Sequence, residues 1–140
     1  MIKVSNTYGP TLRALIQDGQ LSKIERTWDD RISGAFLEHI LENINFSEDL
    51  ISQHIQGRVD IRFDVDSENN ITNVQIHRSA NPLLDNEVLA VFQSVPKISN
   101  EEMHLLRWHE FIITGGPRPA ELANKRRFAL PLNFVISEID

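Results

Sequence analysis

Cysteine is absent from the 140 residues of the chain, which excludes disulfides, thiolate nucleophiles and cysteine-ligated metals. Long hydrophobic runs are also missing: no window approaches the ~20 apolar residues of a membrane-spanning helix. The opening stretch, MIKVSNTYGPTLRALIQDGQ, lacks the apolar segment of a signal peptide. We therefore expect neither a membrane span nor an export signal within this sequence.

Positive charge is in the minority, with 14 lysines and arginines against 20 acidic residues and a formal net charge of -6. Such a balance disfavours general binding of nucleic acid or anionic membranes and is more compatible with basic partners. The hydrophobic fraction of 41% and the charged fraction of 24% are ordinary for a soluble folded protein. No repeat or Pro/Ser-rich linker divides the chain, so we expect a single domain over residues 1–140.

The first 56 residues are predicted to form a helical N-terminal elaboration. Ser22 and Glu25 have the spacing of a capping box, and the sequence Ser33-Gly34 interrupts the helical pattern. Apolar residues recur at helical spacing on both sides of that interruption, and Ser47 precedes a third, short helix. The two apolar stripes consist of Ile24, Trp28 and Ile32, and of Phe36, Leu37, Ile40, Leu41 and Ile44.

The pattern changes to strict alternation at Gly57. Apolar residues at 59, 61, 63 and 65 alternate with charged ones, which predicts a strand with one buried face. The polar run 67–70 predicts a turn, and residues 72–76 predict a returning strand. Asn81-Pro82 predicts the start of a helix that ends before Pro96, with its buried side formed by Leu84, Val88, Val91 and Phe92.

The C-terminal third is predicted to contain one more helix and a closing strand. Ser99 and Glu102 form a second possible capping box, whereas residues 115–119 read as loop and residues 109–114 fit either helix or strand. Residues 127–136 alternate as a strand, and its Pro131 predicts an edge position because proline cannot donate to a ladder. A right-handed crossover then gives an α+β fold, with a three-stranded antiparallel sheet of order 2-1-3 and helices on one face.

Residues 57–98 and the closing strand carry a recognisable motif set. The sequence reads Gly57-Arg-Val-Asp-Ile-Arg-Phe-Asp-Val, Asn70-Ile-Thr-Asn-Val-Gln-Ile, Leu84-Asp85 and Pro131-Leu-Asn-Phe134. In order and spacing this resembles the C-terminal domain of TonB-like energy transducers. The resemblance assigns 57–98 and 127–137 to the core of such a domain and leaves 99–126 as an insert. A family-type proline before Gly57 and a tryptophan near Pro96 are missing.

The resemblance implies a non-enzymatic, periplasmic interaction module without cofactors, whose protein partner is an outer-membrane receptor or another envelope protein. An edge strand would accept an extended segment of that partner, because its backbone N–H and C=O groups are unpaired. The expected partner-binding residues are Arg127, Phe128, Ala129, Leu130, Pro131, Leu132, Asn133, Phe134 and Val135. Alternatively, the strand is covered by the N-terminal helices or the insert, or is blunted by Pro131.

The basic cluster next to this strand has two interpretations. Lys125 and Arg126, with Arg127, could contact an acidic segment of a partner or a phospholipid head group. Positive charge beside an edge strand also discourages aggregation, and this second interpretation is favoured. Trp28 and Trp108 lie on predicted helices and are expected in the core.

The sequence carries no recognisable catalytic or metal-binding motif. The run from Asp64 to Asn70 imitates half of a calcium loop but lacks its glycine and final glutamate, so a hairpin turn is expected. The five histidines form no zinc motif, and no catalytic residue is assigned. Two other hypotheses remain: a cytoplasmic structural or regulatory protein dimerising through its N-terminal helices, and a small enzyme using His104, His109 and Glu110.

Overall fold

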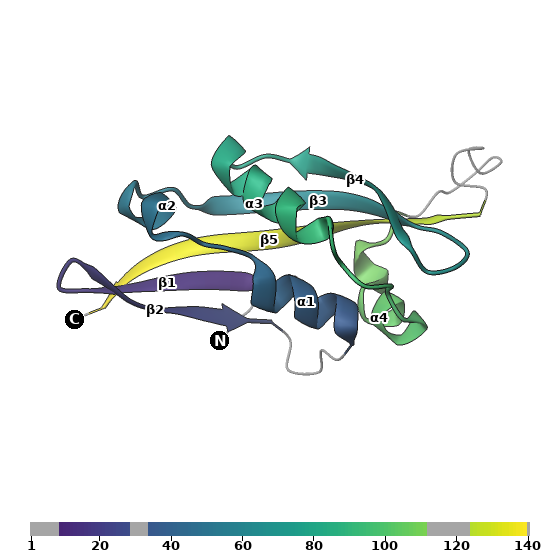
Figure 1. The fold of residues 1–140 in the computed structure, drawn as a ribbon, viewed down its shortest axis with the longest axis horizontal. Coiled ribbons are helices and arrows are strands. Elements are labelled where there is room, and N and C mark those ends of the chain that lie inside the picture. Colours follow the sequence, from purple (N-terminus) through teal and green to yellow (C-terminus); the bar gives the residue numbers. More distant parts are fainter. Residues whose placement is uncertain (1–8, 29–33, 112–123, 140) are drawn as a thin grey trace.

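The computed structural model describes residues 9–28, 34–111 and 124–139, and within them five strands form one mixed sheet (Figure 1). The strands are β1 (Thr11–Gln17), β2 (Gln20–Thr27), β3 (Gly57–Val65), β4 (Ile71–Arg78) and β5 (Arg126–Ile139), in the order β2-β1-β5-β3-β4. The helices are α1 (Ala35–Asn43), α2 (Glu48–Ser52), α3 (Pro82–Phe92) and α4 (Asn100–Leu105), followed by a 3-10 turn, Arg107–His109. Helices α1, α2 and α3 lie over one face of the sheet.

The N-terminal part is a β-hairpin over residues 11–27, so the helix predicted there is wrong. Its turn is Asp18-Gly19, with φ of 53° and 78°, the left-handed pair that a two-residue hairpin turn requires. The predicted stripe misled because a spacing of four residues is also even, so Ile24 of β2 and Trp28 just after it can share one face of an extended strand. The hairpin also has a bulge at Ser22, because Leu15 pairs with Lys23 and Ile16 with Leu21.

This correction also removes the basis of dimerisation through N-terminal helices. Ile24 lies in β2 and Trp28 follows it directly. Both are partly buried against the core of their own chain. Ile32 lies outside the described residues, as does the loop predicted at 115–119. Among the described residues the first helix is α1, and Ser47 caps α2 as predicted, accepting a hydrogen bond from Leu50 N.

The block β3-β4-α3-β5 follows the sequence prediction. β3 is antiparallel to both β4 and β5, which is the expected 2-1-3 order, and Asn81 caps α3. The α+β class is confirmed, but the sheet is larger than predicted. β1 adds to the far side of β5 in parallel, from the pair Thr11 and Asn133 to the pair Gln17 and Ile139. The complete sheet therefore has five strands and mixed direction.

β5 is the central strand of the sheet, so the predicted edge position of residues 127–135 is wrong. Residues 126–134 pair with β3 and residues 133–139 pair with β1. The proline fits because backbone groups of Arg127 and Asn133 bond to Phe111 N and Pro10 O, away from β3. By the same alternation, the missing N–H of Pro131 faces away from β3, at a level of the sheet where β1 has not yet begun. Within the residues that the structure describes, the edges of the sheet are β2 and β4.

The core lies between the sheet and the helices. Phe36 of α1 and Phe92 of α3 contact Phe63 of β3, with ring centroids 5.5 and 5.6 Å away, and Phe63 stacks on Phe128 of β5 at 5.6 Å. These side chains are at most 5% exposed. Burial of each contributes about 1.5–3 kcal/mol. This cluster packs α1 and β5 against the predicted unit of β3 and α3.

Glu102 is a fully buried carboxylate that connects two helices. It completes the predicted capping box of α4, because Ser99 Oγ accepts from Glu102 N and Glu102 Oε1 accepts from Ser99 N. Its other oxygen, Oε2, accepts from Leu37 N in the first turn of α1 at 2.8 Å. Gly34 provides the space, because a Cβ there would lie 2.1 Å from Glu102 Cδ. The carboxylate thus stabilises the N-terminal ends of α1 and α4 together.

Candidate functional site

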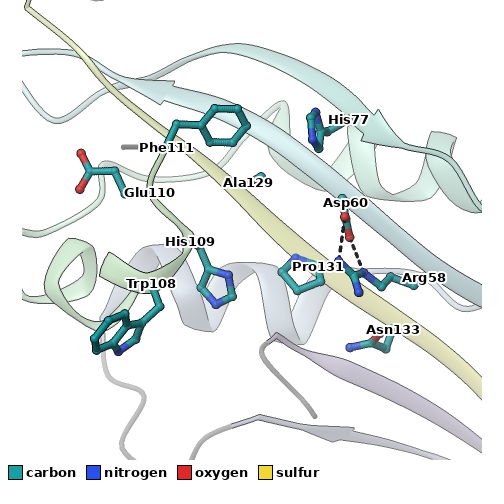
Figure 2. A pocket seen from close by; sticks show the side chains of 10 residues that line it. All are labelled: Arg58, Asp60, His77, Trp108, His109, Glu110, Phe111, Ala129, Pro131 and Asn133. Atoms are coloured by element: carbon teal, nitrogen blue, oxygen red, sulfur yellow. Dashed lines mark hydrogen bonds and ion pairs between the residues drawn. The ribbon is translucent and has the colours of Figure 1, made fainter. Parts of the chain in front are cut away.

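A groove of about 510 Å³ lies on the sheet face opposite the helices, which we call the outer-face groove (Figure 2). It is formed by β3, β4, β5 and the segment that follows α4. Trp108 and His109 lie on one side of β5, with His77 and Asp60 on the other. Its lining residues are Arg58, Asp60, His77, Trp108, His109, Glu110, Phe111, Ala129, Pro131 and Asn133.

The floor of the outer-face groove follows from strand alternation. Ala129, Pro131 and Asn133 are the β5 residues whose side chains leave the core, and Asp60 and Arg58 of β3 stand opposite Pro131 and Asn133. One wall is fixed by a bridge between Glu110 and Phe128 and by the hydrogen bond from Phe111 N to Arg127 O at 2.8 Å. The segment after α4 is therefore tied to the same strand that forms the floor.

Two aromatic side chains give the groove an apolar surface. The Trp108 side chain is 80% exposed and Phe111 is 37% exposed. The Arg107 guanidinium lies over the indole at 5.1 Å, and the His77 ring meets Phe111 edge-on at 5.6 Å. Trp108 is therefore not a core residue, contrary to the sequence prediction. An exposed tryptophan rimmed by polar residues is typical of a protein-binding surface.

Two ion pairs hold the polar lining in place. Arg58 donates to both oxygens of Asp60, at 2.7 and 2.9 Å, and the Asp60 side chain is only 11% exposed. Arg126 donates to both oxygens of Glu110, at 2.9 and 2.7 Å. The hydrogen bonds to these carboxylates raise the pKa of Arg58 and of Arg126 above the usual arginine value. The groove therefore presents paired charges in fixed positions.

The predicted partner-binding residues divide between the two faces of β5. The core face carries Phe128, Leu130, Leu132 and Phe134, each at most 1% exposed, so these side chains cannot reach a partner. The outer face carries Arg127, Ala129, Pro131, Asn133 and Val135, of which Ala129, Pro131 and Asn133 line the groove. Val135 stands opposite Arg13 in the β1 ladder.

The predicted basic cluster is largely neutralised within the chain. Arg127 forms a bidentate pair with Asp64, at 2.7 and 3.0 Å, and these side chains are 11% and 2% exposed. Arg126 is paired with Glu110, and Lys125 lines a separate depression beside the β3-β4 turn. In that turn Asp66 Oδ1 accepts from the backbone of Glu68 and Asn70, as expected of a hairpin turn.

The structure gives little support to the hypothesis of a small enzyme that uses His104, His109 and Glu110. His109 and Glu110 line the groove but His104 does not, and Glu110 is held by Arg126. Among the described residues no group of three histidine or acidic side chains is arranged to hold a metal ion. In the same part of the chain, no helix is long and apolar enough to cross a membrane.

The groove residues missed in the sequence come from segments far apart in the chain. Arg58, Asp60 and His77 were recognisable only as the polar face of a hairpin, and Trp108 and Phe111 only as apolar residues of uncertain structure. No local signal brings these segments together. Their meeting depends on the pairing of β5 with β3 and on the bridge at Glu110.

The family model described as the Gram-negative bacterial TonB protein C-terminal matches residues 42–104. The match supports a TonB-like C-terminal domain over this stretch. The match runs from the end of α1 through α4 and contains the hairpin and helix that carried the resemblance. Comparisons with curated proteins and with solved structures give no significant match.

Domains of the TonB C-terminal family are periplasmic protein-interaction modules of envelope energy transduction, and they are non-enzymatic. The matched residues include Arg58, Asp60 and His77 of the outer-face groove. The Trp108 wall and the whole of β5 lie outside the match. The groove therefore combines a hairpin within the family match with elements outside it.

Proposed function

We propose that the chain is a non-enzymatic interaction module that holds an extended segment of a partner protein in the outer-face groove. The observation that carries the proposal is Trp108, whose side chain is 80% exposed beside paired polar groups. Tryptophan is enriched among the few residues that dominate binding energy in protein interfaces. The family match supports a protein rather than a small molecule as the partner.

The groove follows β5 over the stretch where that strand lacks a strand neighbour on one side. The stretch is bounded by the bond between Phe111 N and Arg127 O and by the bond between Asn133 N and Pro10 O. The open part is shorter than these six residue steps, because Glu110 bridges Phe128 and Gly9 lies against the backbone oxygen of Pro131. The three steps from residue 128 to residue 131 cover about 10 Å, the length of a short extended segment. Because Pro131 has no N–H, binding rests on side-chain contacts rather than on a continuous ladder.

The preformed ion pairs favour binding of such a segment. The Arg58–Asp60 and Glu110–Arg126 pairs are fixed before a partner arrives, so less side-chain entropy is lost on association. A partner peptide could then satisfy its backbone groups on the polar rim while an apolar side chain packs on Trp108. By family, we place this activity in the periplasm, with an outer-membrane receptor or another envelope protein as partner.

The test is a titration of isotope-labelled protein with synthetic peptides copied from the periplasm-facing extended segments of outer-membrane receptors. A binding peptide is expected to shift the Trp108 indole signal and the amides of Ala129 and Asn133. Trp108→Ala should weaken binding about 30-fold, as expected for an interface residue that contributes about 2 kcal/mol. The matched control is Leu83→Ala on α3, an exposed large apolar residue outside the groove, 46% exposed, which should change nothing.

Two outcomes would contradict the proposal. Equal affinity of Trp108→Ala and the parent protein would exclude the groove as the binding surface. Shifts confined to residues 71–78 would instead favour strand addition at the open edge of β4. That edge is less suitable because its ladder has two register shifts and Asn73 has a φ of 50°, irregularities that blunt an edge.

A further inference from the structure

A second groove, of about 800 Å³, lies on the helix-covered face at the far end of the sheet. We call it the end groove. It is bordered by α2, by the turn of the β1-β2 hairpin and by the last residues of β5, which meet at one end of the molecule (Figure 1). Its lining residues are Ile16, Gly19, Gln20, Leu21, Glu48, Asp49, Ile51, Ser52, His54, Ile136 and Glu138.

The floor of the end groove is apolar because the sheet extends beyond the helices that cover it. Ile16, Leu21 and Ile136 come from three adjacent strands and point to the core face, where they are only partly buried. Ile51 of α2 completes the floor. This surface continues the hydrophobic core out to solvent, and apolar area left open in this way favours association with a partner side chain.

The rim of the end groove carries charge of one sign. Glu48, Asp49 and Glu138 line it, and the described part of the chain contributes no lysine or arginine to the lining. None of these three carboxylates forms an ion pair with the described residues, unlike Asp60, Asp64 and Glu110 in the rest of the sheet. The start of α2 favours the first two through its dipole. Glu138 lies on β5, so no helix dipole stabilises its charge.

We infer that the end groove binds a segment of a partner protein in which basic side chains flank an apolar residue. The apolar residue would pack on the floor, and the basic ones would reach the carboxylates of the rim. Charge complementarity of this kind selects partners and speeds their association. The groove lies on the opposite face of the sheet from Trp108, so this contact is independent of the outer-face groove.

The experiment uses a blocked pentapeptide of alternating lysine and leucine, titrated into the labelled full chain at low and at high salt. Amide shifts should map to residues 16–21, 48–54 and 136–138, and binding should weaken as salt rises. The combined variant E48Q, D49N and E138Q should lose about tenfold in affinity, the sum of three exposed charge contacts. Leu21→Ser should also weaken binding, because it removes part of the floor.

The matched control is the combined variant E42Q, E68Q and E101Q, which changes the net charge equally by removing exposed carboxylates elsewhere. It should bind the pentapeptide like the parent protein. The inference is overturned if both triple variants lose affinity equally, since net charge alone would then explain binding. It is also overturned if the same pentapeptide with glutamate in place of lysine binds as well, or if the shifts map to another surface.

Discussion

The clearest energetic test of the structure is removal of the buried carboxylate of Glu102. Glu102→Ala takes away the acceptors of two backbone N–H groups, those of Leu37 in α1 and Ser99 at the start of α4. A buried donor left without a partner costs about 1–3 kcal/mol, and hydrogen bonds to charged acceptors lie at the upper end. Together with the lost packing, we expect the free energy of unfolding to fall by about 3–4 kcal/mol.

Substitutions at neighbouring positions of α4 isolate the contribution of the Glu102 carboxylate to the free energy of unfolding. Ser99→Ala removes only the other half of the capping box and should cost about 1 kcal/mol. Glu101→Ala alters an exposed residue of the same helix and should stay within about 0.5 kcal/mol of the parent. The large effect should therefore belong to position 102 alone.

Gly34 supplies a second, independent test of the same contact. All three nearest neighbours of a Cβ at Gly34 are Glu102 side-chain atoms, at 2.1–2.5 Å, and the residue has a φ of 126°. Gly34→Ala should therefore be severely destabilising in the parent protein. In the Glu102→Ala background the clash disappears, and only the backbone strain of about 1–3 kcal/mol remains. The double variant should thus be more stable than the sum of the single effects by more than about 1 kcal/mol.

Urea unfolding followed by circular dichroism measures these differences, with the midpoint and slope compared across the variants. The reasoning is refuted if Glu102→Ala is no more destabilising than Ser99→Ala. It is also refuted if the effects of Gly34→Ala and Glu102→Ala simply add. Either result would mean that the carboxylate does not join α1 to α4.

Two further predictions concern the sheet. Burial opposes ionisation of Asp64, but hydrogen bonds from Arg127 and Asn73 outweigh it and hold its pKa below the usual aspartate value. The resulting stability is present above the unfolded-state pKa of about 4 and is lost as pH falls through the pKa of the folded state. The urea midpoint of the parent should therefore decline in acid, and Asp64→Asn should make this decline shallower. A decline parallel to that of the parent would contradict this. At Gly19, φ is 78° and an added Cβ would meet nothing within 4 Å, so Gly19→Ala should lower stability in thermal unfolding by about 1 kcal/mol through backbone strain alone. Gly19→Asn should cost less, because asparagine tolerates left-handed backbone, and equal effects of the two variants would count against the hairpin turn.

Local signals in the sequence predicted the middle of the molecule well. The alternation from Gly57, the cap at Asn81 and the capping box at Ser99 each depend on neighbouring residues, and the structure has all three. The hairpin at Asp18-Gly19 also had a local signal, since Asp-Gly is a common hairpin turn. The spacing of Ile24 and Trp28 concealed this signal, because two apolar residues four apart fit one side of a helix and also one face of a strand.

Long-range pairing was the part that local reasoning could not supply. Pro131 correctly indicated a missing ladder bond on one side of its strand, but one unpaired position does not make an edge strand. Whether β1 lies beside β5 depends on contacts between opposite ends of the chain. The outer-face groove, which needs both β5 and the segment after α4, was for the same reason visible only in part.

The central position of β5 has a consequence for how the protein folds. The middle strand of the sheet is the last one in the chain, and its pair Thr11 and Asn133 joins residues 122 positions apart. During synthesis, the two hairpins β1-β2 and β3-β4 can form early, but no strand pairing joins them until β5 has emerged. Pairings this distant in sequence slow folding because loop closure precedes any compensating contact. The sheet should therefore assemble in one late step, with apolar faces of both hairpins open to chaperones until then.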